Sequence, residues 1–161
     1  MSEEIIKSES TTEHLHVLGA TITITADSDD TDGEFSVKNM LAPPGFENGL
    51  HTHEPAEVFH VIDGEMLLYV DGETQYLKPG MTGYVSAGER HGMRVEGDEV
   101  LRVLIVMSPA GAEDFFRAVG EPAADRNLPE PREVTNADLE AIFATGEEHG
   151  FEFFGPLPAD E

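Results

Sequence analysis

The chain has 161 residues, of which 33 are Asp or Glu and 9 are Lys or Arg, giving a formal net charge of −24 at pH 7. Nucleic acid and anionic membrane surfaces repel such a protein, so we expect neither as a partner. Cysteine is absent, which excludes disulfides, thiolate metal ligands and cysteine nucleophiles.

Hydrophobic residues make up 39% of the chain, a globular composition, and no apolar run approaches the roughly 20 residues of a membrane-spanning helix. The N-terminus lacks a basic region followed by an apolar core, so we expect a cytoplasmic protein. Acidic residues are spread along the whole chain and only three residues are Lys. This distribution favours adaptation to a salty cytoplasm, with a plain solvated acidic surface as the alternative.

The N-terminal third is predicted to contain one strand and one loop. Residues 1–13 are polar and are expected to be frayed. Residues 15–25 include the alternation Ile22-Thr23-Ile24-Thr25, which predicts a strand. The acidic run at 26–32 predicts a solvated loop.

Residues 34–107 form a series of short apolar runs separated by turn residues. Asp63-Gly64 and Asp71-Gly72 are turn signals of the hairpin type. Strands are predicted at 35–41, 57–62, 65–70, 75–78, 82–85, 90–95 and 100–107. Strands this short, about ten residues apart, predict an antiparallel sandwich or small barrel in an all-β fold.

The composition changes at residue 108, and two helices are predicted after it, at 113–119 and 136–149. Thr135 and Asp138 form a capping pair for the second helix, and Gly150 suits its end. We therefore predict one domain over residues 1–161, with a barrel at about 34–107 and a C-terminal helical extension at 108–161.

Two further features belong to that extension. Leu139, Ile142 and Phe143 supply one apolar face of the second helix. The aromatic segment 151–154 is expected to pack against the barrel; the alternative is that it helps to close the barrel mouth or contacts another subunit.

Four side chains suited to metal binding lie in two windows of the sequence. His51 and His53 are two residues apart, so in an extended strand they project to the same face. A short turn then lets the next strand return with Glu57 beside them, and His91 lies in the second window. Three imidazoles and a carboxylate are ligands that mid-row divalent metals accept, so we predict a metal site.

The other histidines are not assigned to this site. Alternation from Glu57 places Phe59 on its face of the strand and His60 on the opposite face. His14 and His16 form a second His-x-His pair, which we interpret as a strand or surface pair.

The two windows resemble the two motifs of the cupin superfamily. The first window has its elements at Gly45, His51, His53, Glu57 and Gly64, and the second has them at Gly80, Gly88 and His91. Ser86 stands where the second motif usually has Pro, and Val95 stands where it usually has Asn. Neither departure removes a ligand.

The resemblance implies a double-stranded β-helix, or jelly-roll, barrel with C-terminal helices. It also implies one divalent transition metal (Fe, Mn, Ni, Co or Zn) held inside by His51, His53, Glu57 and His91. The segments 109–122 and 150–156 resemble the tails of single-domain cupins related to bacterial quercetin 2,3-dioxygenases. Cupins of this type commonly pair, so we expect a homodimer.

This resemblance implies a metal-dependent dioxygenase acting on a flavonol or another enolic or phenolic small molecule. Glu57 would be both ligand and catalytic general base. Two alternatives stay open: a sugar isomerase or epimerase, and a non-catalytic module that binds a metal or small ligand. The first is weakened because the barrel's basic residues are only Lys38, Arg90, Arg94 and Arg102. Candidates for the apolar lining are Phe59, Met66, Leu68, Tyr84 and Val103.

Overall fold

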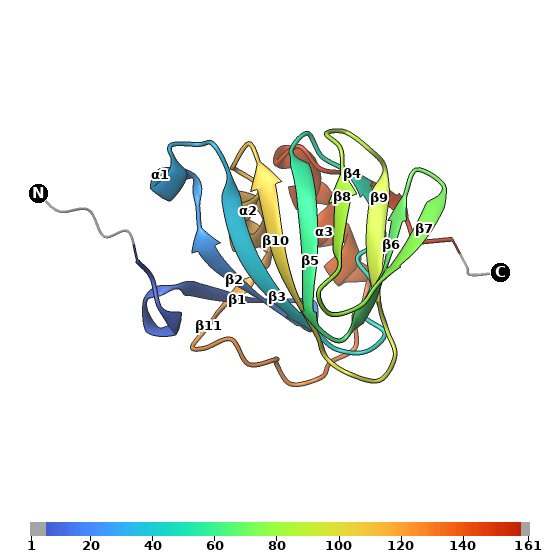
Figure 1. The fold of residues 1–161 in the computed structure, drawn as a ribbon, viewed down its shortest axis with the longest axis horizontal. Helices are drawn as coiled ribbons and strands as arrows, with labels where there is room; N and C mark the ends of the chain where they lie inside the picture. The colour runs from blue at the N-terminus through green and yellow to red at the C-terminus, as the bar shows by residue number, and fades with distance from the viewer. Residues whose placement is uncertain (1–5, 159–161) are drawn as a thin grey trace, which may run out of the picture.

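The computed structural model describes residues 6–158 and shows two antiparallel sheets with helices beside them (Figure 1). Within these residues the larger sheet has seven strands, in the order β11 (Glu121–Ala123), β1 (Glu13–Val17), β2 (Ala20–Ala26), β3 (Ser36–Ala42), β10 (Leu101–Ser108), β5 (Ala56–Asp63) and β8 (Thr82–Val85). The smaller sheet has five, in the order β12 (Glu152–Gly155), β4 (Leu50–Thr52), β9 (His91–Glu96), β6 (Glu65–Val70) and β7 (Glu73–Leu77). The predicted jelly-roll barrel with C-terminal helices is confirmed.

The core lies between the sheets, where the strands place every second residue. In β10 the buried side chains are Leu101, Val103, Ile105 and Met107, while the residues between them are partly exposed. This period of two is what a strand with one face on the core requires. The smaller sheet contributes fully buried residues from β6 and β9, among them Met66, Leu68 and Met93. Each such side chain stabilises the fold by roughly 1.5–3 kcal/mol relative to an exposed position.

The strands predicted between residues 34 and 107 are present to within two residues at each end. Before them, the prediction of one strand at 15–25 is wrong, because β1 and β2 form a hairpin there. Its turn is Leu18-Gly19, and both residues have positive φ, 48° and 93°. A leucine in this conformation is uncommon, so Leu18-Gly19 lacks the Asn-Gly or Asp-Gly pattern by which such a turn is recognised.

The predicted loop at 26–32 contains the short helix α1 (Ser28–Thr31). Asp27 caps it by accepting a hydrogen bond from the backbone N–H of Asp30, and the Asp30 side chain accepts from the N–H of Asp27. The acidic residues that suggested a solvated loop therefore act as helix caps. Upstream, residues 9–11 form a 3-10 turn, η1 (Glu9–Thr11), within the segment expected to be frayed.

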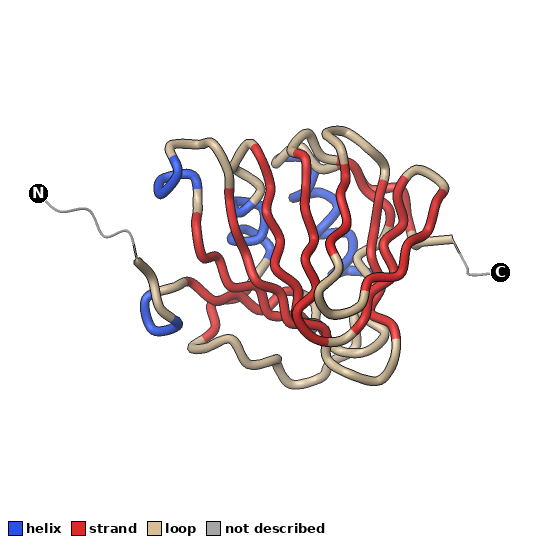
Figure 2. Tube along the Cα trace, viewed as in Figure 1, coloured by secondary structure: helices blue, strands red, loops and turns tan. Residues whose placement is uncertain are grey.

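Both predicted C-terminal helices are present, as α2 (Glu113–Val119) and α3 (Asn136–Glu148). Thr135 and Asp138 cap α3 reciprocally, with hydrogen bonds of 3.2 and 2.9 Å, so the predicted capping pair is confirmed. Figure 2 shows both helices behind the strands of the larger sheet. The sheets also extend beyond residues 34–107, because β1, β2, β11 and β12 all pair with barrel strands or with each other.

Acidic residues outnumber basic ones by 33 to 9, so the surface is strongly acidic. Arg117 of α2 contacts three carboxylates, those of Glu13 and Asp27 at 2.8 Å and that of Asp114 at 3.2 Å. Within residues 6–158, no helix has the length and apolar character needed to cross a membrane.

We predict that salt stabilises the fold because repulsion between carboxylates outweighs the few ion pairs. Between about 0.01 M and about 1 M KCl the Debye length falls from roughly 30 Å to roughly 3 Å, which removes most of this repulsion. We expect the Tm, measured by circular dichroism, to rise on the order of 5 °C over that range. Replacing the exposed Glu73, Asp98 and Glu99 by their amides is expected to reduce the dependence. A Tm that falls as KCl rises would contradict the prediction.

Candidate metal centre

The structure brings together all four predicted site residues, and each is at least 94% buried. His51 lies on β4, His53 follows the end of that strand, and His91 begins β9. His51 and His91 are direct cross-strand partners in the smaller sheet. Glu57 lies on β5, in the larger sheet. The next strand does return with Glu57 beside the histidines, as expected, and the structure adds that it does so from the opposite sheet.

The three histidine rings form a compact cluster. Their centroids are separated by 4.3 Å (His51–His91), 4.7 Å (His53–His91) and 5.5 Å (His51–His53). Each ring offers one nitrogen, and these three atoms lie within 4.8 Å of one another. Oε1 of Glu57 is 3.0 Å from Nε2 of His53 and 3.1 Å from Nε2 of His91. The cluster thus spans the gap between the sheets.

Backbone carbonyls fix the tautomer of every ring. Nδ1 of His51 donates to the carbonyl of Gly49 at 3.0 Å, Nδ1 of His53 to that of Pro55 at 2.9 Å, and Nδ1 of His91 to that of Glu89 at 2.9 Å. A carbonyl oxygen only accepts hydrogen bonds, so each Nδ1 carries the proton. In the neutral ring the lone pair is then on Nε2, the atom suited to bind a metal.

Electrostatics favour a neutral His51 and an ionised Glu57. Burial, helped by the proximity of His91, lowers the pKa of His51 to about 3. Burial alone would raise the pKa of Glu57, but the hydrogen bonds with His53 and His91 and the charge of Lys38 hold it well below its usual range. The Nε2 atoms of His53 and His91 lie within hydrogen-bond distance of this carboxylate oxygen, so ring nitrogens and carboxylate converge on one point where a cation could be held. Three imidazole nitrogens and a carboxylate fit a divalent transition metal, without distinguishing Fe, Mn, Ni, Co and Zn.

Aromatic side chains from the C-terminal segment shield the cluster. The ring of Phe151 lies 5.2 Å from that of His53 and stacks on Phe115 of α2 at 4.4 Å. The ring of Phe153, on β12, lies 5.8 Å from that of His51. The expected packing of segment 151–154 on the barrel is confirmed, and this packing also covers the histidines because β12 pairs with β4.

A cavity of about 130 Å³ lies beside the cluster, between the larger sheet and the two C-terminal helices. Its polar side includes His51, His53, Glu57 and Lys38. Its apolar side is formed by residues such as Phe59, Met107, Phe115, Phe151 and Phe153, together with the predicted α3 face Leu139, Ile142 and Phe143. The site thus combines a few convergent polar groups with an apolar wall, as small-molecule sites usually do.

Of the five predicted lining residues, Phe59 lines this cavity and Met66, Leu68 and Val103 lie in the core. The assignment of Tyr84 is wrong, because 71% of its surface is exposed. In β8, Gly83 and Val85 point inward and Tyr84 points outward. The prediction therefore assigned Tyr84 to the wrong face of this short strand.

The histidines left out of the site have structural roles. Nδ1 of His60 hydrogen-bonds the hydroxyl of Thr82 at 2.8 Å on the outer face, as predicted. His14 is buried in β1 and bonds the hydroxyl of Thr23 at 2.8 Å, which agrees with its interpretation as part of a strand.

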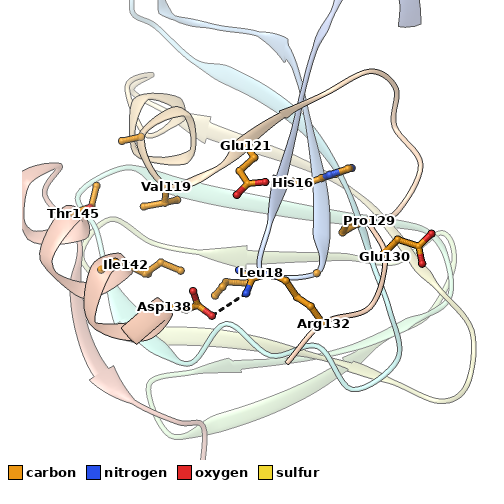
Figure 3. Close-up of a pocket in the computed structure, with 13 residues that line it drawn as sticks. His16, Leu18, Val119, Glu121, Pro129, Glu130, Arg132, Asp138, Ile142 and Thr145 are labelled. Carbon is orange, nitrogen blue, oxygen red and sulfur yellow. Dashed lines mark hydrogen bonds and ion pairs between the residues drawn. The ribbon is translucent and has the colours of Figure 1, made fainter. Parts of the chain in front are cut away.

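A second cavity, of about 420 Å³, opens on the outside of the helices and contains none of the predicted ligands (Figure 3). Its lining includes the ion pair between Arg132 and Asp138, at 3.0 Å. Leu18 and Ile142 line both cavities, so these two side chains stand between the outer and the inner one.

Two facing antiparallel sheets that hold a histidine cluster between them define a jelly-roll protein. Residues 39–107 match the family model described as "Cupin domain". A solved RmlC-like cupin from Shewanella frigidimarina superposes with a TM-score of 0.61 at 24% identity, covering 70% of this chain and 96% of that one. The chain therefore has the fold of a solved cupin, and residues 39–107 carry the match to the cupin domain.

Two curated proteins are similar over part of the chain. Quercetin 2,3-dioxygenase of Bacillus subtilis is 33% identical over 100 residues, which are 62% of this chain and 29% of that protein. An oxalate-binding protein of Thermotoga maritima is 32% identical over 69 residues, which are 42% of this chain and 57% of that protein. The chain thus spans under a third of the first relative's length and little more than half of the second's.

Proposed function

We propose that the chain is a metal-dependent dioxygenase of the quercetinase-like cupin type, acting on a flavonol or another enolic or phenolic small molecule. The observation that carries the proposal is the convergence of three Nε2 atoms and the Glu57 carboxylate on the wall of an apolar cavity. The similarity to quercetin 2,3-dioxygenase supports this choice of chemistry.

In this proposal His51, His53, His91 and Glu57 hold the metal. A bound divalent metal supplies Lewis acidity, which polarises an enol or phenol oxygen and promotes its reaction with oxygen. Glu57 is ionised at neutral pH because its pKa is depressed, so its carboxylate can accept the substrate's hydroxyl proton. Phe115, Phe151 and Phe153 keep the reacting groups away from bulk water.

The proposal is tested by oxygen uptake with quercetin and simpler enols, using protein loaded with Fe(II), Mn(II), Ni(II) or Co(II). We predict that Glu57→Gln lowers uptake by roughly 100- to 10,000-fold, because the amide cannot act as a base. Because Glu57 is also a proposed ligand, the uptake of this variant and of the wild type is compared at equal metal content, measured after loading. Glu54→Gln, which changes an exposed neighbour, is the matched control and should leave both properties unchanged. Uptake that needs neither metal nor Glu57 would reject the mechanism.

A non-catalytic cupin that binds a small ligand is the second candidate. It is favoured by the similarity to an oxalate-binding protein and by the small volume of the inner cavity. Binding of a ligand to every metal-loaded form without oxygen uptake would support it. A sugar-phosphate isomerase has less support, because Lys38 lines that cavity but Arg90, Arg94 and Arg102 do not.

We also propose that the protein is a cytoplasmic homodimer adapted to salt. The acidic composition supports the salt adaptation, and the pairing expected of related cupins supports the dimer. Sedimentation velocity at high KCl gives the mass, and a monomer across the micromolar range would reject the dimer.

A further inference from the structure

Lys38 is a buried cation that the proposed reaction does not yet use. It lies on β3 and is 6% exposed. Its Nζ contacts Sδ of Met107 at 3.4 Å and lies 3.9 Å from the centroid of the Phe116 ring. Among the described residues Lys38 donates no hydrogen bond to an oxygen, although an ammonium carries three N–H donors. A buried charge of this kind is costly unless something compensates for it.

The strand register directs this ammonium toward the metal cluster. Lys38 pairs with Ile105 of β10, whereas Met107, one inward position further along β10, pairs with Glu57 of β5. The Lys38 side chain reaches Met107, so it extends from β3 over β10 to the level of the cross-strand pair of Met107 and Glu57. Neighbouring strands are about 4.8 Å apart, so a long side chain covers this step. Lys38 and Glu57 line the same cavity.

The ammonium keeps its charge at neutral pH. Burial lowers the pKa of Lys38 to about 8, while the carboxylates of Glu57 and Glu113 act in the opposite direction. The inner cavity therefore has a cationic group on β3 close to the metal ligands, with Phe116 and Met107 holding it in place.

The volume of the inner cavity limits the size of its ligand. At about 130 Å³ it is slightly smaller than an engineered apolar cavity of about 150 Å³ that binds benzene. One aromatic ring or a short acid therefore matches the space, whereas a three-ring flavonol would have to extend beyond it.

We propose that Lys38 is a specificity-determining residue that binds an anionic group of the substrate, and that the substrate is a phenol or enol of one ring or less bearing a carboxylate. This inference rests on the proposed function, because the substrate's hydroxyl oxygen is assigned to the metal. The substrate's carboxylate supplies the oxygen acceptor that Lys38 lacks. The cost of desolvating this carboxylate is offset by the ammonium charge of Lys38, which is already buried in the cavity.

The test compares protocatechuate, a single ring with two hydroxyls and a carboxylate, with its neutral amide. Protein loaded with Zn(II), which is redox-inert, allows binding to be measured by calorimetry without turnover. We expect the wild type to bind the acid at least about tenfold more tightly than the amide, as a charge-assisted hydrogen bond implies. Lys38→Met should abolish this preference and leave amide binding unchanged, and Lys38→Arg should retain part of it. Lys78→Met, at an exposed turn, is the matched control and should preserve the full preference.

The outcomes separate this inference from the function on which it rests. If the wild type binds both compounds equally, or Lys38→Met keeps the preference, the role of Lys38 is wrong and the metal-dependent function stands. If the zinc-loaded wild type binds neither compound, the inference about the substrate is rejected, and oxygen uptake with quercetin and simpler enols decides the proposed function separately.

A second readout distinguishes a binding role from a structural one. Because methionine removes a buried charge at similar length, we expect the Tm of metal-free Lys38→Met to be at least that of the wild type. A clear fall in Tm would show that the ammonium serves the fold and would overturn the proposal.

Discussion

Replacing His91 by alanine is expected to abolish stable binding of a divalent metal. His91 is 1% exposed, and its Nε2 faces both the other histidines and Glu57, so no solvent-exposed group can take its place. Loss of a group that merely orients a ligand commonly costs 10- to 100-fold in affinity, so loss of a ligand should cost at least about 100-fold. His51→Ala should behave in the same way. Metal content after loading and dialysis, measured by mass spectrometry, gives the result.

The control for this prediction is His60→Ala, which removes an imidazole from the same barrel but from its outer face. This variant should keep its metal. Far-ultraviolet circular dichroism of all three variants should match the wild type, since the buried hydrophobic core is unchanged. Unchanged metal content in both His51→Ala and His91→Ala would reject the site.

The predicted ligands could be found from the sequence because short-range spacing determines most of their geometry. His51 and His53 are two residues apart, and Glu57 follows four residues later, so a single turn brings three of the four groups near one another. The origin of Glu57 in the opposite sheet was not predicted, because β4 and β5 change sheets across a short turn. Local alternation identifies a strand's faces but does not reveal its partner.

The position of Lys38 in the inner cavity could not be predicted from local alternation either. Its neighbours Ser36 and Met40 share its inward face, so alternation indicates burial. Lysine is rarely buried without a partner, however. The sequence around Lys38 gave no reason to place this residue beside the site. Only the register of β3, β10 and β5 brings it near Glu57. Likewise, the pairing of β12 with β4 joins segments about a hundred residues apart, and no local pattern indicates such a contact.

Close backbone packing behind the histidines is a further feature that the sequence did not reveal. A Cβ on Gly92 would lie 2.3 Å from the carbonyl oxygen of Gly49, and a Cβ on Gly49 would lie 2.9 Å from that of Gly155. These three glycines come from β9, the segment before β4, and β12, which are neighbours in the smaller sheet. The carbonyl of Gly49 is also the group that accepts the Nδ1 hydrogen bond of His51. Because these glycines have no side chains, the backbones can approach closely, and the carbonyl of Gly49 can hold the ring of His51 in place.

Gly92→Ala is therefore expected to damage both the fold and the site. Gly92 does not have a positive φ, so alanine is not excluded by its backbone conformation. The new methyl group would instead collide with the backbone of Gly49 and with Cδ2 of Leu157, at 2.5 Å. We expect a loss of about 2–3 kcal/mol in the free energy of unfolding, measured with urea, as overpacking of a buried site typically costs. Metal affinity should fall as well, because the displaced carbonyl of Gly49 no longer orients His51.

Gly97→Ala is the control that distinguishes a steric clash from the backbone strain of an alanine at positive φ. Gly97 has a φ of 75° and open space around its missing Cβ, so alanine there introduces backbone strain alone. That strain costs roughly 1–2 kcal/mol and lies away from the histidines, so metal affinity should be unchanged. Comparable urea midpoints together with equal metal affinities in the two variants would contradict a role for Gly92 in positioning His51. A loss of metal affinity confined to Gly92→Ala would instead show that the spacing between β9 and the backbone of Gly49 determines where the His51 lone pair points.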